Sequence, residues 1–198
     1  MMDQLILASA SPRRKELLEH IGLQFKICVP DVDETQVERK NIPAELYVQE
    51  LALLKAGAAA GMVGYKRNML VIAADTVVFK DQKILGKPQD ETQAKAMLRM
   101  LSGAEHAVYT GICVLRASDG FSVCKAVRTA VRFKKLTDDK ISRYIRTGEP
   151  MDKAGAYGIQ GYGATLVEGI EGDYFNVVGL PLAALAELLE REFGYEIF

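Results

Sequence analysis

The fold class is decided near the amino terminus, where residues 4–18 read QLILASASPRRKELL. The run at residues 4–8 is short and mostly apolar, which is typical of a buried strand. Ser11 and Pro12 then open a helix whose apolar residues recur at helical spacing and which Gly22 ends. A strand, a loop and a helix in this order predict an α/β protein.

Downstream, the same alternation continues and then gives way to paired strands. Strands are expected at residues 25–29, 69–79, 106–115 and 121–133, and helices at about 43–60, 90–103, 137–148 and 182–193. A last hairpin is expected from residues 165–170 and 174–178, joined by the Glu171-Gly172 turn. Helices between the first strands and hairpins between the later ones predict a mixed twisted sheet with flanking helices.

Length and composition set the class of protein. At 198 residues and 21.8 kDa the chain fits a single domain, which we place at residues 1–198. Apolar residues make up 49% and charged residues 26%, which excludes disorder for most of the chain. Because 25 Lys and Arg balance 26 Asp and Glu, no global basic field attracts nucleic acid, and any anion site must be a local cluster.

Cysteines, histidines and the amino terminus bear on metals and location. The 3 cysteines and 2 histidines form no zinc motif, so a metal would be a hard ion held by carboxylates. Widely spaced, unpaired cysteines fit free thiols in a reducing compartment. Neither a signal peptide nor a bilayer-spanning apolar stretch is recognisable, so we expect a cytoplasmic protein with no membrane partner.

Arg13 and Arg14 fall in the first turn of the helix that Ser11 is expected to cap, where free N–H groups and the helix dipole favour negative charge. A bound anion such as phosphate would remove this conflict, because it accepts hydrogen bonds from the backbone and from both guanidinium groups. Alternatively, both arginines extend into solvent or pair with an acidic neighbour. The local pattern favours neither interpretation.

Lys55 and Asp75 are charged residues at positions where apolar ones are expected. Lys55 continues the helical register of Tyr47 and Leu51, which fits either a lysine at the edge of the core or a member of a site. Asp75 interrupts the most apolar strand, and a buried carboxylate needs a cation, a metal or hydrogen-bond donors. A structural ion pair would suffice, but a general base or metal ligand is favoured.

Other charged stretches have plainer explanations. Taken alone, Glu34 in an acidic loop and Lys87 before a proline would be solvated charges. A later strand carries Arg128, Arg132 and Lys134 on one face, but no aromatic residue among them offers a stacking platform. A solvated sheet face is therefore favoured over a nucleic-acid surface. Neither the Walker nor the Rossmann glycine pattern is present.

The motifs along the chain resemble, in order, those of one family. The segment at residues 7–18 is similar to the opening signature of the Maf family of nucleoside triphosphate pyrophosphatases. The other matching motifs are Asp33-Glu34, Lys55-Ala56, Ala74-Asp75-Thr76-Val77, Lys87-Pro88, Leu101-Ser102-Gly103 with His106, Thr110-Gly111, residues 152–161, and residues 172–181. Together they cover nearly the whole chain, which makes a chance similarity implausible.

This resemblance implies a Maf/inosine triphosphatase-like fold with two lobes around a central cleft, and a homodimer. It also implies hydrolysis of a nucleoside triphosphate to its monophosphate and pyrophosphate with a divalent metal, Mg²⁺ or Mn²⁺. The implied site residues are Asp75 as proton acceptor, Ser11, Arg14, Lys55 and Lys87 on the phosphates, Arg13, Thr76 and Gln160 in base selection, and Glu34 as a ligand of the metal or of water.

The pattern around Gln160 resembles the branch of the family that acts on dTTP and UTP. The same residues fit a house-cleaning role on modified pyrimidine nucleotides. Because the family is also linked to arrest of septum formation, a nucleotide-binding regulator of cell division without turnover is the alternative. Asp75 could take the proton of the attacking water or hold the metal, and the sequence does not separate these roles.

Overall fold

Strands and helices follow one another much as the sequence predicts in the computed structural model, which describes residues 4–37, 42–64 and 68–198. The strands are β1 (Gln4–Leu7), β2 (Phe25–Ile27), β3 (Met69–Lys80), β4 (Lys83–Leu85), β5 (Glu105–Arg116), β6 (Ser122–Phe133) and β7 (Val167–Glu171). The α-helices are α1 (Pro12–His20), α2 (Ala44–Val63), α3 (Glu91–Leu101), α4 (Asp138–Ile145), α5 (Tyr174–Val178) and α6 (Leu182–Phe193). Short 3-10 turns are η1 (Glu34–Gln36), η2 (Glu149–Asp152), η3 (Ala154–Ala156) and η4 (Gly161–Thr165). In the described residues, no helix is long and apolar enough to span a bilayer.

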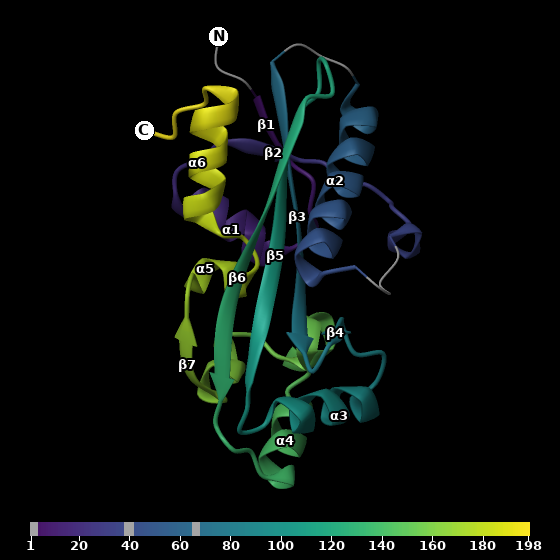
Figure 1. Cartoon of the computed structure of the whole chain (residues 1–198), viewed down its shortest axis with the longest axis vertical. Coiled ribbons are helices and arrows are strands. Elements are labelled where there is room, and N and C mark those ends of the chain that lie inside the picture. The colour runs from purple at the N-terminus through teal and green to yellow at the C-terminus, as the bar shows by residue number, and fades with distance from the viewer. Residues whose placement is uncertain (1–3, 38–41, 65–67) are drawn as a thin grey trace. The chain divides into compact units, whose positions relative to one another are not determined.

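The strands form one mixed sheet with the order β2-β1-β3-β5-β6-β7, and β4 pairs with β3 outside this path. β1 is parallel to both β2 and β3. The pairs β3–β4 and β6–β7 are antiparallel. A mixed sheet with flanking helices confirms the predicted fold class (Figure 1).

The chain divides into two compact units. The first contains residues 1–75, 110–127 and 179–198, and the second contains residues 76–109 and 128–178. Strands β3, β5 and β6 contribute residues to both units. Candidate residues of the first unit are Ser11, Arg13, Arg14, Glu34, Lys55 and Asp75, and those of the second are Thr76, Lys87 and Gln160.

Helices cover both faces of the strands in the first unit. Helix α2 lies on one side, and α1 and α6 lie on the other (Figure 1). Ala56 and Ala59 of α2 are completely buried and share a core cluster with Val71 and Ala73 of β3. Because these side chains are small, α2 packs closely on the strands and carries Lys55 to the edge of the core.

The second unit has its own core beneath α3 and α4. Leu98 of α3, Phe133 of β6 and Tyr144 of α4 are buried in one cluster. Asp90 caps α3 as predicted, since its Oδ1 accepts a hydrogen bond of 2.7 Å from the backbone N–H of Gln93. This cap fixes the start of the helix just after the loop that holds the candidate residue Lys87.

Residues 174–178 form helix α5, and the predicted second strand of a hairpin is wrong there. Oδ1 of Asp173 accepts hydrogen bonds from the backbone N–H groups of Phe175 at 2.7 Å and Asn176 at 3.3 Å. Gly172, with φ of 123°, turns the chain before this cap. The aromatic and β-branched residues favour a strand, but the capping bonds of Asp173 stabilise a helical turn instead.

Candidate active site

Lys55 on α2 is the centre of a charged cluster in the first unit. Its Nζ lies 2.6 Å from Oδ1 of Asp75 on β3 and 2.8 Å from Oε1 of Glu34, the first residue of η1. The side chains of Lys55 and Asp75 are only 14% and 13% exposed, whereas that of Glu34 is 46% exposed. Three segments far apart in sequence thus place one ammonium between two carboxylates, one half-open to solvent.

The local sequence explains why the ion pair forms. Tyr47 and Leu51 are buried on α2, and Lys55 follows in the same register. Asp75 follows the completely buried Ala74 on β3. A carboxylate taken out of water at that point needs a cation, and the Lys55 ammonium supplies it.

Asp33 fixes the turn that presents Glu34. Its Oδ1 accepts hydrogen bonds from the backbone N–H of Thr35 at 3.0 Å and from the Thr35 hydroxyl at 2.6 Å. These hydrogen bonds lower the pKa of Asp33. The acidic loop is therefore an ordered turn that directs Glu34 to Lys55, while its acids stay exposed to solvent as its composition suggests.

Arg14, in the first turn of α1, adds a positive charge beside this cluster. Its Nε donates a hydrogen bond of 2.8 Å to the carbonyl oxygen of Gly179, and its Nη1 donates one of 3.2 Å to Oγ of Ser9. Burial lowers the pKa of Arg14, while the carboxylates of Asp75 and Glu34 oppose this shift. Because arginine stays charged in proteins, Arg14 is a fixed cation within the field of both carboxylates.

Ser9 links Arg14 to the start of α1. Its Oγ accepts hydrogen bonds from Nη1 of Arg14 and from the backbone N–H of Ser11, both at 3.2 Å. Ser11 occupies the N-cap position, but its side chain caps no backbone N–H of the described residues, so the expected Ser11 cap is wrong. Sequence reasoning assigned no role to Ser9. The available signal was a small polar residue just beyond the carboxyl end of a buried strand.

The remaining candidate residues lie at separate points of the chain. Arg13 is half-buried in the first turn of α1, and its charge contributes to the lowered pKa of Arg14. Thr76 is on β3 in the second unit. Lys87 is exposed in the loop after β4, and Gln160 is exposed at the start of η4. The cluster around Lys55 is defined by residues of the first unit alone.

The cluster offers charges of both signs to a ligand. The oxygens of Glu34 and Asp75 are hard donors of the kind that Mg²⁺ and Mn²⁺ prefer. Among the described residues, no group of three or more His, Cys, Asp or Glu side chains is placed to hold a metal ion. Mg²⁺ commonly takes one or two protein carboxylates and completes its shell with water and substrate phosphates. Arg13 and Arg14 at a helix N-terminus suit phosphate oxygens.

Proteins named dTTP/UTP pyrophosphatase from several bacteria are similar to this chain over nearly its whole length. The one from Alkaliphilus metalliredigens is 53% identical over 192 residues, covering 97% of each chain. The one from Moorella thermoacetica is 51% identical, covering 100% of this chain and 98% of the relative. The one from Acetivibrio thermocellus is 52% identical, covering 99% of this chain and 98% of the relative.

A solved structure and a family model also match most of this chain. The structure of the Staphylococcus aureus Ham1 protein aligns with a TM-score of 0.48 at 16% identity, covering 83% of this chain and 79% of that one. The family model described as Maf-like protein matches residues 4–192, a range that contains every candidate site residue. The chain therefore belongs to the Maf family.

Proposed function

We propose that this chain hydrolyses dTTP and UTP to the nucleoside monophosphate and pyrophosphate. Relatives more than half identical to it carry the name dTTP/UTP pyrophosphatase. The observation that carries the proposal is the contact of Lys55 with both Asp75 and Glu34, beside the fixed charge of Arg14. A carboxylate next to positive charges suits attack of water on a phosphate, because it can take a proton while the charges stabilise the phosphate oxygens.

In this mechanism Asp75 accepts the proton of a water that attacks the α-phosphorus. A bond forms between the water oxygen and phosphorus as the bond to the bridging oxygen of the leaving pyrophosphate breaks, so no covalent enzyme intermediate is needed. Lys55 holds Oδ1 of Asp75 at 2.6 Å and thereby orients the carboxylate. Lys55 and Arg14, with Ser11 and Lys87 by family resemblance, bind the phosphate oxygens on which negative charge grows.

We also propose that Glu34 holds a divalent metal, Mg²⁺ or Mn²⁺, beside the Asp75 base. Their oxygens already share one cation, the Lys55 ammonium, and hard oxygen donors are the ligands that these metals prefer. When bound, the metal would supply positive charge to the leaving pyrophosphate and to the attacking water. Lys55 would then share the Glu34 carboxylate with the metal and keep its contact with Asp75.

Selection of the base is assigned to Arg13, Thr76 and Gln160 on the family resemblance. The exposed amide of Gln160 can both donate and accept hydrogen bonds, which suits a pyrimidine ring with a carbonyl next to an N–H. In the same proposal residues 1–198 act as one catalytic domain and the chain forms a homodimer. Modified pyrimidine nucleotides fit the same groups as dTTP and UTP.

The decisive variant is Asp75→Asn, which keeps the shape of the side chain and removes its charge. We expect kcat with dTTP to fall by about 10²–10⁴-fold, because the general base is lost. Asp81→Asn is the matched control, since Asp81 follows β3 closely in sequence but is 68% exposed and pairs with Lys80 at 3.4 Å. This control should keep its turnover. Circular dichroism and a melting curve establish that both variants fold.

The assay incubates each protein with Mg²⁺ or Mn²⁺ and a panel of ordinary and modified nucleoside triphosphates, and separates the products by anion exchange. Monophosphate plus pyrophosphate, formed fastest from dTTP and UTP, supports the proposal. Nucleoside diphosphate plus phosphate would overturn the assignment of the bond that breaks. Full activity of Asp75→Asn would overturn its role as base. Nucleotide binding without turnover by the wild type would favour the regulator of cell division.

A further inference from the structure

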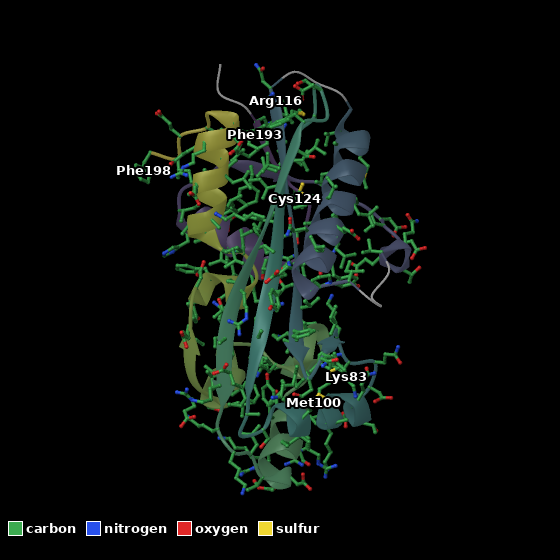
Figure 2. The ribbon with its side chains drawn as sticks, viewed as in Figure 1. Lys83, Met100, Arg116, Cys124, Phe193 and Phe198 are labelled. Carbon is green, nitrogen blue, oxygen red and sulfur yellow. The ribbon has the colours of Figure 1, made fainter. Side chains whose placement is uncertain are left out.

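Cys113 and Cys124 are two free thiols on neighbouring strands of the first unit. Cys113 on β5 is completely buried, whereas Cys124 on β6 is half-buried. Both pack in the core cluster beneath α2, so their side chains lie on the same face of the sheet. In Figure 2 the sulfur of Cys124 lies beside the β5–β6 hairpin. The proposed hydrolysis uses neither thiol.

Backbone hydrogen bonds fix which residues of β5 and β6 face each other. The N–H of Arg116 donates to the carbonyl oxygen of Phe121 at 2.8 Å, and that of Phe133 donates to Ala104 at 3.0 Å. The register therefore stays the same from one end of the hairpin to the other. Cys113 lies three residues before Arg116, so it faces the residue that lies three after Phe121. That residue is Cys124.

The register also fixes the type of pair. Directly opposed residues of an antiparallel ladder alternate between hydrogen-bonded and non-hydrogen-bonded pairs. Arg116 and Phe121 form a hydrogen-bonded pair, and Cys113 is an odd number of residues away from Arg116. Cys113 and Cys124 are therefore a non-hydrogen-bonded pair, with Cα atoms about 4.5 Å apart. Disulfides span Cα separations of about 4.4–6.8 Å, so the two sulfurs can join without movement of the strands.

The two thiols differ in reactivity. Cys113 lies opposite Cys124 on the neighbouring strand, and hydrogen bonding between the two thiols lowers the pKa of Cys124. The same bond, together with burial, raises the pKa of Cys113. A thiolate is the nucleophile in thiol oxidation, so the half-buried Cys124 reacts first with an oxidant. Cys113, directly opposite on the neighbouring strand, then resolves the product.

We propose that Cys113 and Cys124 form a dithiol modification site that a hydroperoxide oxidises to a cross-strand disulfide. The Cys124 thiolate attacks one peroxide oxygen, so that an S–O bond forms, the O–O bond breaks and hydroxide leaves to become water. Cys113 loses its proton and attacks the Cys124 sulfenic acid, forming the S–S bond and releasing a second water. Two thiols lose two electrons, and hydrogen peroxide becomes two waters.

The test treats the reduced, full-length protein with hydrogen peroxide, blocks remaining thiols with N-ethylmaleimide and maps tryptic peptides by mass spectrometry. Trypsin cleaves after Arg99, Arg116 and Lys125, so Cys113 and Cys124 fall in separate peptides, residues 100–116 and 117–125. We expect these two peptides to be joined, with a mass two hydrogen atoms below their sum. Of the 3 cysteines, Cys28 should carry the maleimide.

Single cysteine variants test whether oxidation is specific to the pair of Cys113 and Cys124. Cys28→Ala is the matched control, because Cys28 is half-buried and lies 4.0 Å from the sulfur of Met62, and this variant should still form the cross-link. Cys113→Ala should leave a sulfenic acid on Cys124 that dimedone traps. A disulfide between two copies of the chain, or a sulfinic acid on Cys124 with Cys113 still reduced, would overturn the proposal.

A second measurement compares the melting temperatures of the oxidised and the reduced protein. Closing a loop of about 10 residues restricts the unfolded chain, so the melting temperature of the oxidised wild type should rise by about 5–10 °C above that of the reduced form. The same treatment should leave the melting temperature of Cys124→Ala unchanged. A cross-link that forms but lowers the wild-type melting temperature would contradict closure without strand movement.

Discussion

His106 is a buried histidine that should make the fold sensitive to mild acid. It is 4% exposed, its Nε2 lies 2.8 Å from the hydroxyl of Tyr157, and its ring packs edge-on against Phe133. Burial, with a smaller effect of the Lys80 charge, lowers the pKa of His106 to about 4. An unfolded histidine has a pKa of about 6.5. Between these values the unfolded chain binds more protons, so the free energy of unfolding falls as the pH falls.

We expect the free energy of unfolding to decrease by about 2 kcal/mol between pH 7 and pH 5, most of it from His106. Urea unfolding at the two pH values measures this change. In His106→Gln the decrease should be much smaller, while in His20→Gln, which alters an exposed histidine at the end of α1, it should remain. Equal decreases in all three proteins would show that His106 does not protonate on unfolding.

Among single residues, the sequence singled out the charged members of the candidate site but not Ser9, the polar residue that contacts Arg14. Lys55 and Asp75 stood out because a charge at a buried position needs a partner, and they proved to be each other's partner. The contact of Glu34 with Lys55 depends on the turn made by Asp33, which composition does not reveal. The role of Ser9 depends on where the Arg14 side chain folds back, which no local pattern determines.

Among the elements, the packing of α2 on β5 depends on Gly111. A Cβ atom at this position would lie 2.2 Å from the carbonyl oxygen of Val48 and 2.7 Å from the backbone nitrogen of Gln49. These are backbone atoms and do not move away easily, so Gly111→Ala should lower the free energy of unfolding by about 3 kcal/mol or more. Because α2 carries Lys55, turnover of the variant that still folds should fall as well.

Urea unfolding measures the free energy of unfolding of Gly111→Ala and of Gly57→Ala, which serves as the control. Gly57 lies on the exposed face of α2, and no atom of the described residues lies within 4 Å of the position that a Cβ would take there. Alanine favours a helix over glycine, so Gly57→Ala should raise the free energy of unfolding by about 0.5–1 kcal/mol. If both variants were equally stable, the close approach of α2 to β5 would be wrong.

Residues 174–178 were predicted as a strand but form a helix, which shows why short elements are hard to predict. Aromatic and β-branched residues favour a strand, but over five residues this preference is weak, and the helical conformation depends on the two capping bonds to Asp173. Long elements such as α2 and α6 were predicted nearly to their ends, because many residues of high helix propensity, mostly Ala, Leu and Glu, outweigh any single contact.

For the molecule as a whole, the alternation of strands and helices predicted a mixed sheet but not its strand order. β1 pairs with β3 although the whole of α1, β2 and α2 lies between them in the sequence. Such pairing depends on contacts between segments that are distant in the sequence, and local periodicity does not reveal these contacts. The hairpin of β5 and β6 was predictable because its two strands are neighbours in the chain.

Charge over the whole molecule predicts that single-stranded nucleic acid does not bind. The net charge is -1, and the basic face of β6 is partly neutralised, since Nε of Arg132 lies 2.9 Å from Oε2 of Glu168. Fluorescence anisotropy with a labelled oligonucleotide at low salt should give a Kd above about 100 μM.

The variant Glu168→Gln, which leaves Arg132 without this carboxylate, should bind the oligonucleotide equally weakly. The reason is that no aromatic residue lies among the basic residues to stack on bases. Micromolar binding that weakens steeply with salt would contradict this prediction and would make the β6 face a nucleic-acid surface.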